Sequence, residues 1–239
     1  MQTSPAADSG LRAEGLVLGI DTCGPSGSVA LVQRAGSELD LLGQTELAGR
    51  SYSATLVAAV ADLLKQHGIA PRELGAIVAV HGPGSFTGVR VGLSAVKGLA
   101  EPSGIPVAAV SRLDVLAHKA GVLSAALDAH RHEVFLRVET PGAKVRETLA
   151  GKTDFATIMP VPERIAVCDD AAEELIRAVW PETMIERVAA PSALDAIEMF
   201  AAKLSARVFV DLALLDGHYL RRSDAEIFGE PLQTLARRA

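Results

Sequence analysis

Residues 76–100 read AIVAVHGPGSFTGVRVGLSAVKGLA, and this stretch decides the fold. It opens with an apolar run of strand length, Ala76–Val80, and continues through a loop rich in glycine and proline at 82–88. The remaining residues have the length and composition of a helix. The order of strand, glycine loop and helix predicts an α/β protein.

The glycines of this stretch allow two interpretations. Backbone N–H groups at a helix start, freed of side-chain bulk, can cradle a phosphate. Glycine inside a helix costs about 1 kcal/mol relative to alanine, so several small residues at near four-residue spacing indicate another backbone packed closely against them. These small residues are Gly88, Gly92, Ala95 and Gly98.

Composition restricts the class of protein. With 239 residues and 49% hydrophobic content, the chain can bury a core as one large domain or two modest ones. Its net charge of −6 argues against a direct grip on nucleic acid through many phosphate contacts. The longest uncharged apolar run, 54–61, is far shorter than the roughly 20 residues that span a bilayer. Two distant cysteines, Cys23 and Cys168, indicate a reducing compartment and no zinc site, so we expect a cytoplasmic protein.

The predicted elements fall into two groups. The first has antiparallel strands, a helix, the opening stretch and a further strand, at 16–20, 28–32, 38–47, 52–66, 76–100 and 106–110. The second has strands and helices at 122–128, 133–139, 164–168, 170–178 and 192–207. Asp170 and Glu173 fit a capping box, and Ser192 fits a helix cap.

This order predicts two lobes. We expect a flexible leader over 1–14, a first lobe over 15–112, a smaller second lobe over 113–208 and a C-terminal segment over 209–239. The leader has neither the basic start nor the apolar core of a signal peptide.

Six residues are candidates for a phosphate loop: Asp21, Thr22, Gly82, Gly84, Ser85 and Gly88. An ATP-using protein of actin-like architecture also needs a second glycine hairpin, a glycine turn for adenosine and carboxylates that position a metal. The candidate hairpin at 129–132 contains no glycine, and the glycines of the last third stand singly. We therefore interpret the loop as degenerate.

Metal and nucleophile chemistry find little support in the sequence. The six histidines contain no pair at the i, i+4 spacing of a helical metal site. Ser85 and Thr87 lack the G-x-S-x-G spacing of a nucleophile elbow and stand where helix caps are expected. The sequence predicts no metal and no resident cofactor.

Several motifs resemble the TsaB (YeaZ) family over about residues 15–222. The string GPGSFTGVR is highly specific, and the other matching segments support it. These segments are Ile20–Thr22, Ser28–Ala30, Lys97–Ala100, Asp128–Ala129, Glu133–Phe135 and Tyr219–Arg221.

The resemblance implies a two-lobed actin-like fold of the ATPase and sugar-kinase class (ASKHA, ribonuclease H-like), in degenerate form. It implies a non-catalytic scaffold subunit in the formation of N6-threonylcarbamoyladenosine in tRNA. The implied partners are a catalytic TsaD-like subunit and a TsaE-like ATPase, with tRNA bound only through the complex. It further implies a homodimer in isolation and a nucleotide only at the interface of the complex.

The resemblance also implies the partner surface. It would lie on the helices over 52–66 and 87–100, with the interface residues Leu56, Ala59, Val60, Leu63, Val89, Gly92, Leu93, Ala95 and Val96. The first helix is apolar around most of its circumference, so we expect it to pack against another surface in addition to the sheet. The catalytic paralogue has a His-x-x-x-His metal pair where residues 111–118 here read SRLDVLAH. The loop at 49–53 and the hairpin at 129–132 depart from the family pattern.

Two other functions remain as alternatives. An ATP-dependent phosphotransferase or ATPase would use Asp21, Thr22 and the loop at 82–88. A metallopeptidase would carry a stoichiometric metal ion.

Overall fold

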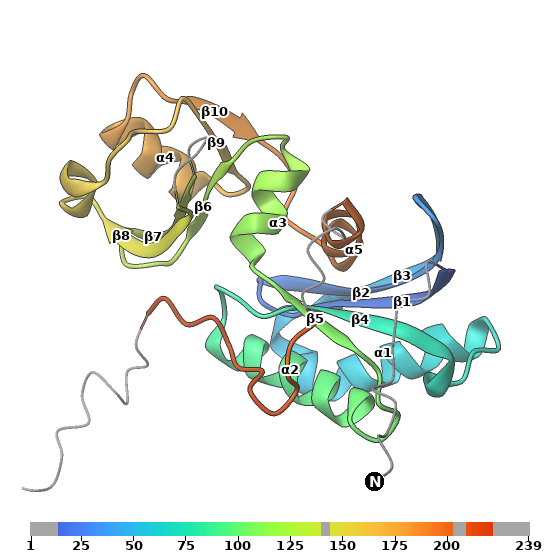
Figure 1. Ribbon diagram of the computed structural model, residues 1–239. Helices are drawn as coiled ribbons and strands as arrows, with labels where there is room; N and C mark the ends of the chain where they lie inside the picture. Colours follow the sequence, from blue (N-terminus) through green and yellow to red (C-terminus); the bar gives the residue numbers. More distant parts are fainter. Residues whose placement is uncertain (1–13, 140–143, 203–208, 222–239) are drawn as a thin grey trace, which may run out of the picture.

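The computed structural model describes residues 14–139, 144–202 and 209–221, which form two lobes, each built on a five-stranded mixed sheet (Figure 1). The first sheet has the order β3-β2-β1-β4-β5. Strands β1 (Glu14–Asp21), β2 (Ser26–Ala35) and β3 (Glu38–Ala48) are antiparallel neighbours. Strands β4 (Leu74–Val80) and β5 (Val107–Val110) continue the sheet in parallel with β1.

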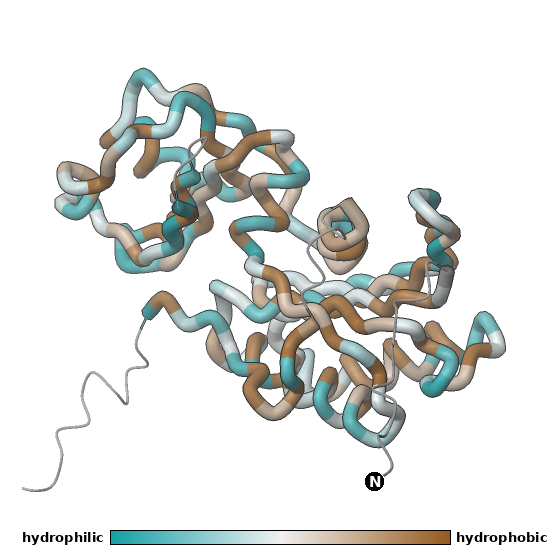
Figure 2. The backbone as a smooth tube through the Cα atoms, in the orientation of Figure 1, coloured by the Kyte–Doolittle hydropathy of each residue, from teal (hydrophilic) through white to brown (hydrophobic). Residues whose placement is uncertain are grey.

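Helices cover both faces of the first sheet. The helices α1 (Tyr52–Gln66) and α2 (Phe86–Ala100) pack side by side on one face, and α5 (Ala193–Ala202) packs against β1, β2 and β4 on the other (Figure 1). Because both faces are covered, β4 is apolar throughout and β1 is apolar between its charged end residues, Glu14 and Asp21. Figure 2 shows these apolar residues along the strands and in the flanking helices.

The second sheet repeats the plan of the first, in the order β10-β9-β6-β7-β8. Its strands β6 (Ser124–Asp128), β7 (Glu133–Val138) and β8 (Arg146–Gly151) are antiparallel. Strands β9 (Arg164–Val167) and β10 (Met184–Arg187) run parallel to β6. Side chains alternate along β6 and β7, one set facing α4 (Asp170–Val179) and the other α3 (Arg112–Lys119). Short 3-10 turns lie at Gly49–Ser51, Pro71–Glu73 and Asp154–Thr157.

The same strand order in two lobes is the actin-like ATPase and sugar-kinase fold predicted above. The helix predicted over 52–66 matches α1 residue for residue, and α2 begins one residue before the predicted start. Strands β8 and β10 were not predicted, because each is short and lacks a strong apolar run. The lobe boundaries stay predictions, but α5 packs with the first lobe although it follows the second in sequence.

Helix caps show a small correction. Asp169, and not Asp170, caps α4 by accepting the backbone N–H of Ala172 at 2.7 Å. Ser192 caps α5 as predicted, because its hydroxyl accepts the N–H of Asp195 at 3.3 Å. Residues 203–207 of the predicted last helix lie outside the described residues.

The segment 209–221 connects the lobes. Its Val210 N–H donates to the Val107 carbonyl at 2.9 Å, along the open edge of β5, and Leu215 is buried in the first core. Farther on, Leu220 packs against the core between the second sheet and α3, and Arg221 pairs with Glu133. This segment therefore contacts both lobes.

Candidate functional site

The loop after β1 and the glycine loop before α2 meet at one sheet edge. Strands β1 and β4 are parallel neighbours, so their carboxyl ends, at Asp21 and Val80, lie side by side. In open α/β sheets ligands bind at this edge. The structure therefore brings all six candidate phosphate-loop residues to one place.

The two loops pack directly against each other. The Ser85 N–H donates to the Cys23 carbonyl at 2.8 Å, and the Thr22 hydroxyl donates to the Gly88 carbonyl at 2.7 Å. A Cβ on Gly84 would overlap the Cys23 carbonyl oxygen, and a Cβ on Gly88 would overlap that of Thr22. The predicted close backbone contact is therefore present at Gly88, whereas a Cβ on Gly98 would meet nothing within 4 Å.

The start of α2 is also capped internally. The Ser85 hydroxyl accepts the Gly88 N–H at 3.2 Å, as expected for an N-cap serine. A Cβ on Gly92, one turn later, would overlap the Thr22 hydroxyl. On α1, the Tyr52 hydroxyl donates to the Gly24 carbonyl at 2.8 Å, and burial first, then the Asp21 charge, raise the pKa of Tyr52 to about 12. Helices α1 and α2 are therefore both fixed to the loop after β1.

A buried ion pair occupies the end of β1. Asp21 is 0% exposed and Arg112, the first residue of α3, is 5% exposed. Arg112 Nε lies 3.4 Å from one Asp21 carboxylate oxygen, and the other oxygen accepts the Cys23 N–H at 2.8 Å. Burial acts to lower the pKa of Arg112, but the neighbouring acidic groups, with Asp21 foremost, together outweigh it, so the pKa is raised. The side chain that would hold a metal in an ATP site thus has a resident cation.

Burial also controls the neighbouring thiol. It raises the pKa of Cys23 well above its ordinary value, and the Asp21 charge acts in the same direction. Cys23 Sγ contacts the Val80 carbonyl at 3.2 Å. A buried, protonated thiol of this kind is a poor nucleophile.

A polar network spans the lobes beside this site. Glu147 on β8 accepts the Ser111 hydroxyl at 2.8 Å and lies 2.7 Å from His218 Nε2. Burial acts to raise the pKa of Glu147, but the hydrogen bonds of His218 and Ser111, together with the charges of His218 and Arg137, hold the pKa below its ordinary value. His81 stacks on His218 with ring centroids 5.4 Å apart, and burial lowers the pKa of His81.

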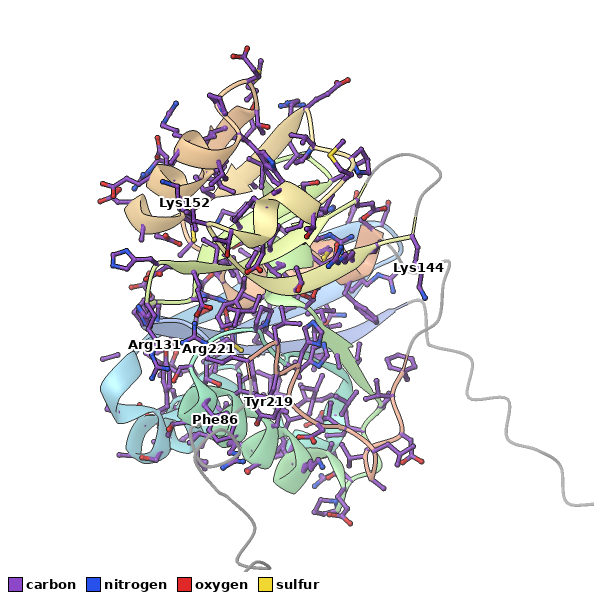
Figure 3. All side chains as sticks on the ribbon, turned by 90° about the vertical axis from the view of Figure 1, so that its left-hand side faces the viewer. Phe86, Arg131, Lys144, Lys152, Tyr219 and Arg221 are labelled. Carbon is purple, nitrogen blue, oxygen red and sulfur yellow. The ribbon has the colours of Figure 1, made fainter. Side chains whose placement is uncertain are left out.

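The hairpin between β6 and β7 has an unusual backbone. His130, Arg131 and His132 all have φ near +60°, a region that favours glycine. The Asp128 carboxylate accepts the His130 N–H at 2.7 Å, and Arg221 pairs with Glu133. Arg221 reaches this hairpin, with its guanidinium 3.5 Å from the His130 carbonyl, and it follows closely on Tyr219, whose ring packs on Phe86 (Figure 3). The hairpin therefore adopts without glycine a backbone conformation that glycine usually supplies.

An apolar groove runs between α1 and α2 and reaches down to Ile20 of β1. Its volume is about 680 Å³, and most of its lining is aliphatic. The lining residues include Leu56, Val57, Val60, Ala61, Leu64, Arg90, Val91, Ser94, Ala95, Gly98 and Leu99. Val57 is 68% exposed, which is high for an apolar side chain.

The predicted interface residues have different surroundings. Leu56, Val60 and Ala95 line the groove, although Leu56 and Val60 are also part of the core, at 1% and 8% exposed. Ala59 is half-buried outside the lining. Leu63, Val89, Leu93 and Val96 belong to the core, and Gly92 is buried against the Thr22 side chain. Their role in partner binding stays a prediction. Val57, Arg90 and Leu99 also line the groove but were not among the predicted interface residues. Helical spacing could have indicated them, because they lie on the same helices beside the predicted positions.

Among residues 14–139, 144–202 and 209–221, no three His, Cys, Asp or Glu side chains form a group that could hold a metal ion. No helix of the described chain is long and apolar enough to cross a membrane.

Comparison with known proteins finds relatives in sequence and structure. A TsaB protein of tRNA threonylcarbamoyladenosine biosynthesis from Bacillus subtilis is 35% identical over 123 residues, which cover 50% of this chain and 52% of the relative. The TsaB protein of Haemophilus influenzae is 34% identical over 125 residues, covering 50% and 51%. The chain spans about half the length of the curated relatives it matches. YeaZ from Pseudomonas aeruginosa has a TM-score of 0.68 and 25% identity, covering 86% of this chain and all of that one.

Fold and site together define a protein of the actin-like ATPase and sugar-kinase class. The family described as TsaD, tRNA N6-adenosine threonylcarbamoyltransferase, matches residues 44–227. The chain belongs to this family and, by its TsaB and YeaZ relatives, to the TsaB (YeaZ) branch within it.

Removing the resident cation should destabilise the fold. We expect Arg112→Ala to lower the free energy of unfolding by about 3–5 kcal/mol, because it leaves the buried Asp21 carboxylate unpaired. Urea denaturation measures the loss. The double variant Asp21→Asn with Arg112→Ala should recover part of it. Arg164→Ala, which breaks a half-exposed pair with Glu186, serves as control and should cost about 0–1 kcal/mol. Equal losses of unfolding free energy for Arg112→Ala and Arg164→Ala would contradict the claim that Arg112 compensates a buried charge on Asp21.

Acidification should destabilise the protein through His81 and Glu147. Both have a lowered pKa in the folded state, so both bind protons more readily when unfolded. Their contributions are present at neutral pH and are lost as the pH falls, for His81 below 6.5 and for Glu147 below 4.5. Denaturation curves taken above and below pH 6.5 measure the free energy of unfolding on both sides of this transition. We expect His81→Gln to reduce the loss of that free energy just below pH 6.5. The exposed His67→Gln should not, and identical slopes for the two variants would refute the role of His81.

Proposed function

We propose that this protein is a non-catalytic scaffold subunit in the formation of N6-threonylcarbamoyladenosine in tRNA. The observation that carries the proposal is the exposed apolar groove between α1 and α2, on helices fixed to the rest of the fold. The relatives named as TsaB biosynthesis proteins support the pathway. The proposed partners are a TsaD-like catalytic subunit in the groove and a TsaE-like ATPase in the same complex.

The packing at the end of β1 supports a role without catalysis by this chain. A phosphate at the glycine loop would need the space in which Gly84 and Gly88 touch the backbone of Cys23 and Thr22. A metal at Asp21 would have to displace Arg112. Both changes would rearrange buried groups that hold α2 and α3 in place, so we propose that any nucleotide binds only at the interface of the complex.

The net charge supports an indirect contact with tRNA. At −6, the chain is a poor electrostatic match for a phosphate backbone, so we propose that tRNA meets it only within the complex. A homodimer through the same helices would cover the groove when the partner is absent. We place the protein in the cytoplasm, where tRNA is modified.

The alternative, an ATP-dependent phosphotransferase or ATPase, makes a different prediction for the isolated chain. It requires tight binding of ATP with Mg²⁺ and turnover, whereas the scaffold proposal requires neither. Calorimetry on the isolated chain separates the two.

The groove should be essential for partner binding. We expect Val57→Asp to weaken binding to the TsaD-like subunit of the same organism by about 100-fold or more, because a carboxylate would be buried against aliphatic side chains. Val57 is 68% exposed, so the variant should keep its fold. Ala58→Asp, on the neighbouring exposed position of α1 outside the groove lining, is the matched control. Unchanged binding by Val57→Asp, measured by co-purification and calorimetry, would sink the proposal.

A further inference from the structure

A single charged side chain borders the apolar groove. Among the residues that line it, all within the described chain, Arg90 alone carries a charge. Arg90 lies on α2 and is exposed. The groove is therefore a largely aliphatic surface with one fixed point of positive charge.

Arg90 stacks on one aromatic ring, which itself packs on a second. Its Cζ atom lies 3.8 Å from the centroid of the Phe86 ring, one helical turn earlier on α2. The Phe86 ring packs in turn on Tyr219, with centroids 4.8 Å apart (Figure 3). No carboxylate of the described residues forms an ion pair with Arg90. The guanidinium is thus pre-positioned, with its hydrogen-bond donors unused by an acidic partner from this part of the chain.

Covering the groove would take this cation out of water. Burying a charge without a counter-charge is costly, whereas a carboxylate that meets the guanidinium with two hydrogen bonds compensates the loss. A partner that fills the groove with an apolar helix therefore gains affinity if the helix also presents an aspartate or glutamate to Arg90.

A second copy of this chain supplies no such group from its groove. A two-fold interface brings the same surface of each copy together, and no lining residue is acidic. Such a dimer would bring two Arg90 side chains into one apolar interface without a carboxylate from the lining. The charge therefore disfavours the self-pair and favours a different partner.

We propose that Arg90 determines partner choice at the groove, selecting a chain whose apolar docking helix carries a carboxylate over a second copy of this protein. The inference rests on the proposed function, because it names the chemistry of the partner that the groove accepts. Selectivity of this kind would let the same apolar surface bind a catalytic subunit tightly and pair with itself only weakly.

The test measures two associations with the same variants. Calorimetry gives the affinity of the full chain for the TsaD-like subunit of the same organism, and sedimentation equilibrium gives its self-association. Arg90→Met keeps much of the side-chain length and removes the charge. We expect it to weaken binding to the TsaD-like subunit about 10- to 100-fold and to leave self-association unchanged or strengthened. Arg90→Glu should weaken the mixed complex further, and Arg90→Lys should fall between wild type and Arg90→Met.

Two outcomes would overturn the inference. One is that Arg90→Met binds the TsaD-like subunit with wild-type affinity. The other is that Arg90→Met weakens the mixed complex and self-association equally, which would indicate a role in packing only. Thermal unfolding of each variant verifies that the exposed substitution leaves the fold intact. Val57→Asp separates this inference from the proposed function. If Val57→Asp abolishes binding to the TsaD-like subunit and Arg90→Met does not weaken it, the groove is the docking site and Arg90 does not determine partner choice. If Val57→Asp binds normally, the docking proposal itself is wrong.

Discussion

The contact between two backbones, at residues 22–23 and 84–88, is the constraint on which the rest of the structure depends. Glycine is required there because Gly84 and Gly88 approach the Cys23 and Thr22 carbonyls more closely than a Cβ would permit. The same contact fixes α2 to β1 through the Thr22 hydroxyl, and Tyr52 fixes α1 to the adjoining turn. Because α1 and α2 are both fixed to the loop after β1, the groove between them has a defined shape.

The Asp21–Arg112 pair extends this constraint to the second lobe. Arg112 begins α3, which packs on β6, β7 and β9, so a charge on the first sheet is tied to the helix that carries the second. A buried pair of this kind adds little net stability compared with apolar side chains, but removing one partner is costly because the other charge is left buried and uncompensated. The Asp21 charge is paired inside the chain and an apolar groove is displayed outside it, and the proposed scaffold role rests on these two features.

Much of this could be predicted from residues 76–100 and the segments around them. The helix over 52–66 and the glycine-loop helix were found because their apolar and small residues recur at helical spacing. Strands β8 and β10 escaped prediction because Arg146–Gly151 and Met184–Arg187 mix polar and apolar residues at a sheet edge. Arg112 could not be recognised as the partner of Asp21, since 91 positions separate them and only the fold joins them. Within the helices, periodicity found the apolar positions but could not tell those facing the sheet, such as Val96, from those facing the groove, such as Val57.

Hydrogen exchange of the intact chain, alone and with its TsaD-like partner, tests the central claim most directly. The account predicts new protection in α1 and α2 on adding the partner, and no change at 21–24 or 82–88 when ATP and Mg²⁺ are added to the isolated chain. Protection of those two loops by the nucleotide, with α1 and α2 unaffected by the partner, would contradict it.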